Sequence, residues 1–126
     1  IDPSSNEVID TINVDSAPWH VAFGGSNIYV SNYGSNTVSV INPAANELVD
    51  TIEVAGSTGL RGLAYDGSNI YVADAIRDTV SVINPATNEV THTVGVSGGP
   101  MIIVYDGTSL FVSNKDEATV TKLLPM

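Results

Sequence analysis

The chain of 126 residues contains no cysteine, which excludes disulfide bonds, thiolate zinc sites and covalently attached c-type haem. Positive charge is also scarce, because four Lys and Arg stand against 14 Asp and Glu, for a formal net charge of −10. A surface of this sign repels phosphate, so we expect no nucleic-acid partner. No apolar run is long enough to cross a bilayer, so we expect no membrane insertion.

The rest of the composition indicates a folded protein that acts outside the cell. Hydrophobic residues make up 43% of the chain, enough for the core of one domain rather than a disordered coil. The acidic, cysteine-free chain fits a secreted or cell-surface location, which we predict. The sequence starts at Ile1 without an apolar signal region, so two interpretations stay open: a removed signal peptide, or a piece of a longer protein.

Two sequence blocks recur along the chain, and equivalent isoleucines stand at positions 1, 41 and 83. A period of this length with short strands is typical of repeats that bury their faces against neighbouring repeats. We divide the chain into repeats at approximately 1–40, 41–82 and 83–126, within one domain covering 1–126. The recurring blocks are Asn36–Glu47 with Asp78–Glu89, and Phe23–Asn32 with Tyr65–Asp74 and Tyr105–Asn114.

The middle repeat shows how one unit is expected to fold. Short strands are predicted at 63–65, 69–73, 79–83 and 89–96, and no segment has helical periodicity. Asp66-Gly67 favours a tight hairpin, and Pro85 with a left-handed Asn88 favours a second turn. Hairpin-linked strands form an antiparallel meander of four, and such sheets arranged radially make a β-propeller. The predicted class is therefore all-β, with three four-stranded propeller blades per chain.

A short signature ends the second predicted strand of each repeat: Tyr29-Val-Ser-Asn32, Tyr71-Val-Ala-Asp74 and Phe111-Val-Ser-Asn114. With the Thr-Val-Ser-Val-Ile-Asn-Pro block that follows in two repeats, this signature resembles the Tyr-Val-Thr-Asn repeats of surface-layer β-propellers. The resemblance implies the propeller fold. It leaves activity open, because that family includes cell-surface proteins, secreted binding proteins and enzymes.

The order of the predicted strands leaves one blade incomplete. The sequence begins with a lone outer strand at Glu7–Val14 and ends with three strands that lack an outer one. Three blades are too few for a ring, since propellers have 4–8 blades. We therefore expect a six-bladed, strand-exchanged homodimer, in which a second copy of the chain supplies the missing strand. The alternative is that the chain is half of a longer protein.

One face of the predicted propeller carries the candidate site. It is formed by the loops that precede each inner strand and the loops that join the second and third strands. The repeats differ most in these loops, and three of the four cations fall there, which is typical of a binding surface. The candidate ligand-binding residues are Trp19, His20, Asn32, Tyr33, Arg61, Asp74, Arg77, Met101, Asn114 and Lys115.

His20 and Trp19 each allow two interpretations. His20 could be a metal ligand or general base, but the inner strands offer no Asp or Glu beside it, and a catalytic zinc needs three protein ligands. We therefore favour a histidine bonded to a neighbouring backbone, and we predict no catalytic residue, metal site or cofactor. For Trp19 we favour packing between blades over stacking on a ligand.

The function predicted from these observations is that of a noncatalytic extracellular scaffold or recognition module. It would bind a cell-surface protein or a glycan through the loop face. The alternative is a metal-dependent enzyme similar to the propeller lactonases or streptogramin lyases, and a third hypothesis is a docking subunit for a redox partner.

Overall fold

The computed structural model describes residues 1–54, 56 and 59–126 and contains three antiparallel sheets. The first sheet is formed by β1 (Pro18–Phe23), β2 (Ile28–Asn32), β3 (Thr37–Asn42) and β4 (Glu47–Glu53) in that order. The second contains β5 (Leu60–Tyr65), β6 (Ile70–Asp74), β7 (Thr79–Asn84) and β8 (Glu89–Gly95). The third contains β9 (Pro100–Tyr105), β10 (Leu110–Asn114) and β11 (Thr119–Leu123).

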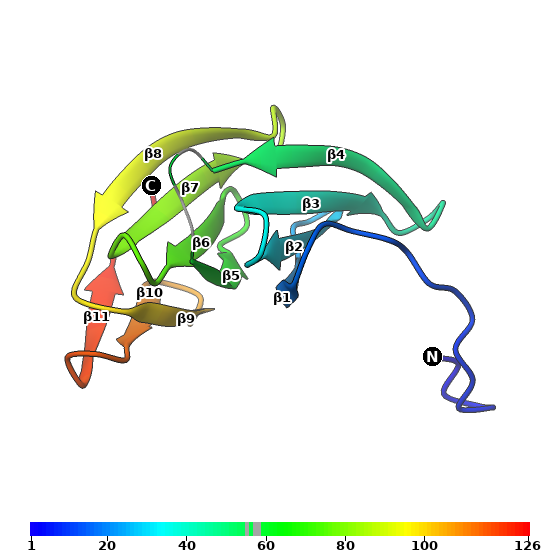
Figure 1. Ribbon diagram of the computed structural model, residues 1–126, viewed down its shortest axis with the longest axis horizontal. Coiled ribbons are helices and arrows are strands. Elements are labelled where there is room, and N and C mark those ends of the chain that lie inside the picture. The colour runs from blue at the N-terminus through cyan, green and yellow to red at the C-terminus, as the bar shows by residue number, and fades with distance from the viewer. Residues whose placement is uncertain (55, 57–58) are drawn as a thin grey trace.

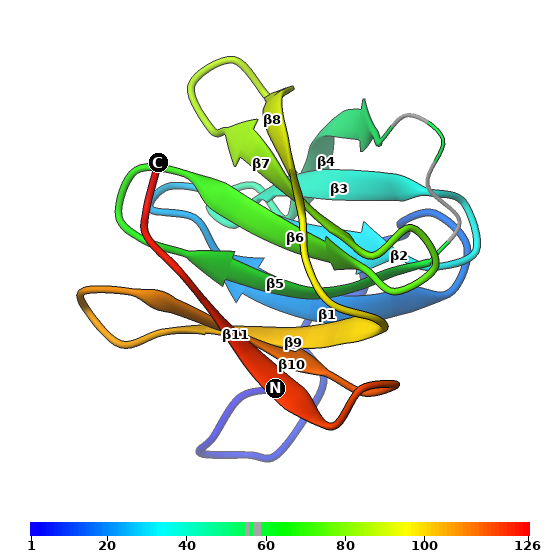
Figure 2. The same ribbon diagram turned by 90° about the vertical axis from the view of Figure 1, so that its left-hand side faces the viewer.

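The three sheets follow one another around an arc, as Figure 1 shows. Strands β1, β5 and β9 are neighbours on the inner side of the arc, and β4 and β8 lie on its outer side (Figures 1 and 2). The predicted all-β class and the four-stranded meander are confirmed. Among the described residues no helix is long and apolar enough to span a membrane.

The predicted turn chemistry is present in the second sheet. Gly67 has φ +95°, and the Asp66 carboxylate accepts the N–H groups of Ser68 and Asn69 at 2.8 Å each. Asn88 has φ +56°, the left-handed conformation expected from its place at the end of the turn. Local sequence therefore fixes both hairpins.

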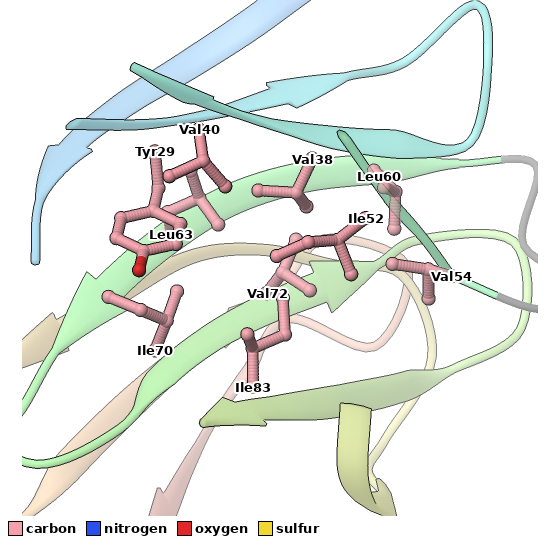
Figure 3. Packing of buried hydrophobic residues seen from close by; sticks show 10 residues of the cluster. All are labelled: Tyr29, Val38, Val40, Ile52, Val54, Leu60, Leu63, Ile70, Val72 and Ile83. Carbon is pink, nitrogen blue, oxygen red and sulfur yellow. The ribbon is translucent and has the colours of Figure 1, made fainter. Parts of the chain in front are cut away.

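The core lies between successive sheets, and the middle strands of the second sheet pack on both faces. Figure 3 shows the cluster between the first two sheets, where Val38 and Ile52 face Leu63 and Val72. A second cluster, which includes Val80, joins the second sheet to the third. The acidic residues of the outer strands are exposed: Glu47, Asp50, Glu53 and Glu89.

One predicted strand is wrong for the single chain. Residues 8–14 form no strand, and the segment before them contains only an isolated bridge between Asp2 and Glu7. The physical reason is that β1–β4 already form a four-stranded sheet, whereas the sheet that lacks an outer strand ends in β11 at the other end of the arc, far from this segment (Figure 1). A single chain therefore contains two four-stranded sheets and one three-stranded sheet, with β11 at the edge of the latter.

Candidate functional site

Two sets of loops share one face of the arc, as the sequence predicts. In every sheet, the first residue after the second strand donates its N–H to a carbonyl in the loop before the inner strand. The three bonds have equal length, and they tie the two loop sets together. They run from Tyr33 to Ala17, from Ala75 to Gly59 and from Lys115 to Gly99, each at 2.9 Å. The predicted loop 56–61 includes Ser57 and Thr58, which lie outside the described residues.

Irregular strand pairing brings Trp19 and Arg61 to this face. The pairing of β1 with β2 shifts between Pro18 and His20, and the pairing of β5 with β6 shifts between Leu60 and Leu63. Such bulges change the direction of a side chain and are common beside functional sites. Trp19 and Arg61 both lie within these irregular stretches.

The Arg61 guanidinium packs against two aromatic rings of the first sheet. Its central carbon lies 4.6 Å from the centroid of the Trp19 ring and 4.0 Å from that of Tyr33. The two rings are themselves 6.3 Å apart and inclined by 46°. Cation–π contacts of this kind contribute roughly 0.5–2 kcal/mol each, so they hold the guanidinium in place. We call Trp19, Tyr33 and Arg61 the aromatic–arginine cluster.

Hydrogen bonds from Ser31 and His20 fix the backbone beneath this cluster. Ser31 Oγ donates to the Arg61 carbonyl at 2.5 Å and accepts the His20 N–H at 3.2 Å. The Leu63 N–H donates to His20 Nδ1 at 2.7 Å, which confirms the interpretation of His20 as bonded to a neighbouring backbone. Because Nδ1 accepts, the neutral imidazole carries its proton on Nε2, which is therefore a donor.

The aromatic–arginine cluster leaves part of the guanidinium without hydrogen bonds. Arg61 Nε and Nη1 are shielded from solvent, yet neither has a hydrogen-bond partner among the residues that the structure describes. A buried charged donor without an acceptor is costly, because it has lost its hydration. Trp19 is 51% exposed and Tyr33 38% exposed, so the two aromatic rings of the cluster are accessible from solvent.

Three predicted site residues anchor the loops instead of facing outward: Asn32, Asp74 and Asn114 are all buried. The Asn32 amide donates to Thr37 Oγ1 at 3.1 Å and Ser39 Oγ at 2.8 Å, and the Asn114 amide makes the equivalent pair of bonds in the third sheet. The Asp74 carboxylate accepts the N–H groups of Ile76 and Arg77 at 3.1 Å. These side chains shape the face from below.

The other predicted residues lie on the same side but outside the cluster. Arg77 and Lys115 are exposed, and Met101 is half-buried at the beginning of β9. The structure thus unites Trp19, His20, Tyr33 and Arg61 from the predicted set. The structure also places Ser31 in the site, a residue that was not predicted. Its only signal in the sequence was a difference between repeats, because the corresponding residue of the second sheet is Ala73.

Within the described ranges, no group of three or more His, Asp or Glu residues could hold a metal ion. The site offers hydrogen-bond donors beside flat aromatic rings. Arg61, the indole N–H of Trp19 and His20 Nε2 are all donors. This arrangement is suited to binding.

Comparisons with known proteins place the fold. The profile of the YNCE-like beta-propeller family matches residues 2–117. None of the curated proteins matches the sequence. Among solved structures, BamB from Moraxella catarrhalis is 16% identical with a TM-score of 0.83, over 99% of this chain and 37% of that one.

Two further structures are similar at comparable identity. Kuenenia stuttgartiensis hydrazine synthase is 20% identical over 99% of this chain and 42% of that one, with a TM-score of 0.75. A putative 6-phosphogluconolactonase from Bacteroides uniformis is 16% identical over 90% of this chain and 38% of that one, with a TM-score of 0.76. The chain spans less than half the length of each, and these likenesses show the fold alone.

Proposed function

Because the chain belongs to the YncE-like β-propeller family, we propose that it is a noncatalytic recognition module that binds its target through the loop face. The observation that carries this proposal is the aromatic–arginine cluster of Trp19, Tyr33 and Arg61. Exposed aromatic and arginine side chains are the residue types most enriched at binding hot spots. The target that we propose is a cell-surface glycan or protein.

The setting that we propose is the cell surface or the extracellular medium, in the manner of surface-layer propellers. The formal charge of −10 and the absence of cysteine are compatible with that setting. The repeat signature at Tyr29–Asn32 supports the surface-layer relationship.

The recognition role can be tested on an array of immobilised cell-surface glycans and proteins. We expect the wild-type chain to retain one class of target, and Trp19→Ala to lose it. Val49→Ala is the matched control, because Val49 is also 51% exposed but lies on the outer strand β4. Equal binding by the two variants, or no retained target, would contradict the proposed role.

We also propose that two copies assemble into a six-bladed ring by exchanging residues 8–14. Asp10-Thr-Ile-Asn-Val14 repeats Asp50-Thr-Ile-Glu-Val54, which covers the second half of outer strand β4 and the residue after it. In the first sheet Val38 pairs with Ile52 and Val40 with Asp50. The segment therefore carries the sequence of an outer strand, and β11 is an edge strand that can accept one.

The repeat predicts the register of this exchange. Ile12 of one copy would lie opposite Val120 of the other, which is 65% exposed in the single chain. Asp10 would lie opposite Lys122, where the first two sheets have Val40 and Val82. Opposite charges and apolar residues in facing positions both stabilise strand pairs.

The assembly is tested by light scattering and by a cysteine pair. We expect a particle of twice 13.1 kDa, and a double variant Ile12→Cys, Val120→Cys should form a covalent dimer on oxidation. The chain has no native cysteine, so any disulfide is the engineered one. The control pair Ile12→Cys, Thr121→Cys places the two thiols on opposite faces. A monodisperse 13.1 kDa particle would refute the exchange.

The lactonase-type alternative has less support from the site. It would need several converging acidic or histidine ligands in the channel, whereas the described residues contain no such group of three. His20 already uses Nδ1 to accept the Leu63 N–H. Recognition is therefore the function that these contacts favour.

A further inference from the structure

We propose that the two end sheets of the arc join in a dimer, so that Trp19 of a second copy packs against Met101 and Lys115. This inference rests on the proposed six-bladed ring and adds to it a composite site on the loop face, which neither copy completes alone. The carrying observation is that the end sheets expose the positions that are buried at the two junctions inside the arc.

The first sheet presents an apolar face that the second and third sheets bury. The fourth residue of the inner strand is Leu63 in the second sheet and Ile103 in the third, and both are buried against the sheet before them. Its counterpart in the first sheet is Val21, which is 59% exposed. The described chain has no sheet before the first one, so this face is open at one end of the arc (Figure 1).

The third sheet presents the complementary face at the other end of the arc. Val38 and Val80, the second residues of β3 and β7, are fully buried against the sheet that follows each of them. Their counterpart in β11 is Val120, which is exposed. Val104 is also exposed, whereas the matching Ala64 of the second sheet is buried. The two ends thus carry the two halves of one junction, and a second copy of the chain matches both.

The junction between the first two sheets shows which residues meet on the loop face. There the earlier sheet contributes Trp19 and Tyr33, and the later sheet contributes Arg61 between their rings. The second residues of the three inner strands are Trp19, Arg61 and Met101. The first residues after the three second strands are Tyr33, Ala75 and Lys115. At a junction that closes the ring, the earlier sheet therefore contributes Met101 and Lys115, and the later sheet contributes Trp19 of the second copy.

The closing junction exchanges the roles of cation and ring. Inside the arc an arginine lies between aromatic side chains, whereas here the indole of Trp19 meets an ammonium group and a thioether. An ammonium group over an indole face makes a favourable cation–π contact, and a thioether sulfur also packs favourably on an aromatic ring. Trp19 is half exposed in the single chain, so it has free surface for both contacts. The two ends therefore match in chemistry as well as in register.

The closing junction can be followed by fluorescence, because Trp19 is the one tryptophan of the protein. We would compare the wild-type chain with Val120→Asp, which places a charge in the closing junction but in a different sheet from Trp19. Light scattering should give a dimer for the wild type and a monomer for the variant. We expect Trp19 of the dimer to emit at shorter wavelength and to be quenched less by acrylamide, because the second copy covers it.

Three variants in the loops after β6 and β10 test the composite site itself. Lys115→Ala should raise the dimer dissociation constant by roughly tenfold, because the cation–π contact is lost at both closing junctions. Lys115→Arg keeps that contact and should stay within about threefold of the wild type. Arg77→Ala removes the same charge from the corresponding loop of the middle sheet and should also stay within about threefold. Sedimentation over a dilution series measures the constants, and far-ultraviolet circular dichroism checks that each variant is folded.

The outcomes separate this inference from the assembly on which it rests. A wild-type dimer whose Trp19 is quenched as strongly as that of monomeric Val120→Asp would overturn the composite site and leave the exchange of residues 8–14 in place. Equal dissociation constants for Lys115→Ala and Arg77→Ala would have the same meaning, and so would a Val120→Asp chain that remains dimeric. A wild-type particle of 13.1 kDa would overturn both the composite site and the exchange, whereas the array decides the recognition role separately.

Discussion

The close spacing of the second and third sheets depends on the absence of a side chain at Gly62. A Cβ atom added there would lie 2.6 Å from the Met101 carbonyl oxygen, 2.9 Å from Ile102 Cα and 3.2 Å from Ile103 N. Each of these atoms belongs to the backbone of β9, so no change of rotamer relieves the overlap. Gly62→Ala must therefore move the second and third sheets apart.

This displacement lowers the free energy of unfolding. Ordinary contact begins at 3.4 Å, so the shortest contact must lengthen by several tenths of an ångström. The movement loosens the cluster that contains Ala64 and Ile103. Overpacking of this kind typically costs about 1–3 kcal/mol, and the gain of about 0.4–1 kcal/mol from a less flexible unfolded chain offsets part of it. We expect a net loss of about 1–2 kcal/mol.

Urea unfolding measures this loss, and Gly95→Ala is the matched control. Gly95 also lies in a strand, β8, but a Cβ there meets nothing within 4 Å. We expect that variant to be unchanged or more stable by about 0.4–1 kcal/mol. If both variants shift the midpoint alike, close approach of the two sheets at Gly62 is not what governs stability.

Three further predictions concern single side chains. Ala118 has φ +53°, a left-handed conformation that is unfavourable for alanine. Ala118→Asn should therefore raise the free energy of unfolding by about 1 kcal/mol. A lower urea midpoint for this variant would contradict the prediction. Ser31→Ala removes the hydroxyl that donates to the Arg61 carbonyl and should lower the free energy of unfolding by about 1–3 kcal/mol. Ser113→Ala is its control, because it loses only an exposed bond from the Ile102 N–H, and it should lower the free energy of unfolding less in the same denaturation assay. Burial raises the pKa of Tyr29 above its ordinary value of 10.0. The stability that this group contributes is therefore present below the unfolded pKa and lost as the pH rises towards the folded pKa. The melting temperature of Tyr29→Phe should fall less steeply with alkaline pH than that of the wild type. Identical slopes for the two proteins would contradict the assignment.

The sequence predicts the sheets well because their signals are local. Gly67 and Asn88 adopt the positive φ angles that their turns require, and the alternation of apolar residues places Val38 and Val80 in the core. Such features depend on residues a few positions apart, so a single sequence is enough to locate them. The loop face was predictable for the same reason, since it follows from the strand order.

The details of the site depend on distances between sheets, which no local pattern contains. Asn32 and Asn114 look like binding residues because they end their strands beside variable loops, yet their amides are used inside the sheet. The contact of Arg61 with Tyr33 joins two sheets and requires bulges that the sequence does not mark. The strand predicted over Glu7–Val14 does not form because the free edge of β11 lies at the other end of the arc from this segment (Figure 1).

The anchoring of each loop within its own sheet has a practical consequence for engineering. Asn32, Asp74 and Asn114 each make bonds within their own sheet that hold the turns above them. A loop can therefore be replaced, as antibody loops are replaced on a constant framework, while the sheet below keeps its shape. The fold thus separates the variable loops from the sheets that carry stability, so the loop sequences can be changed one turn at a time.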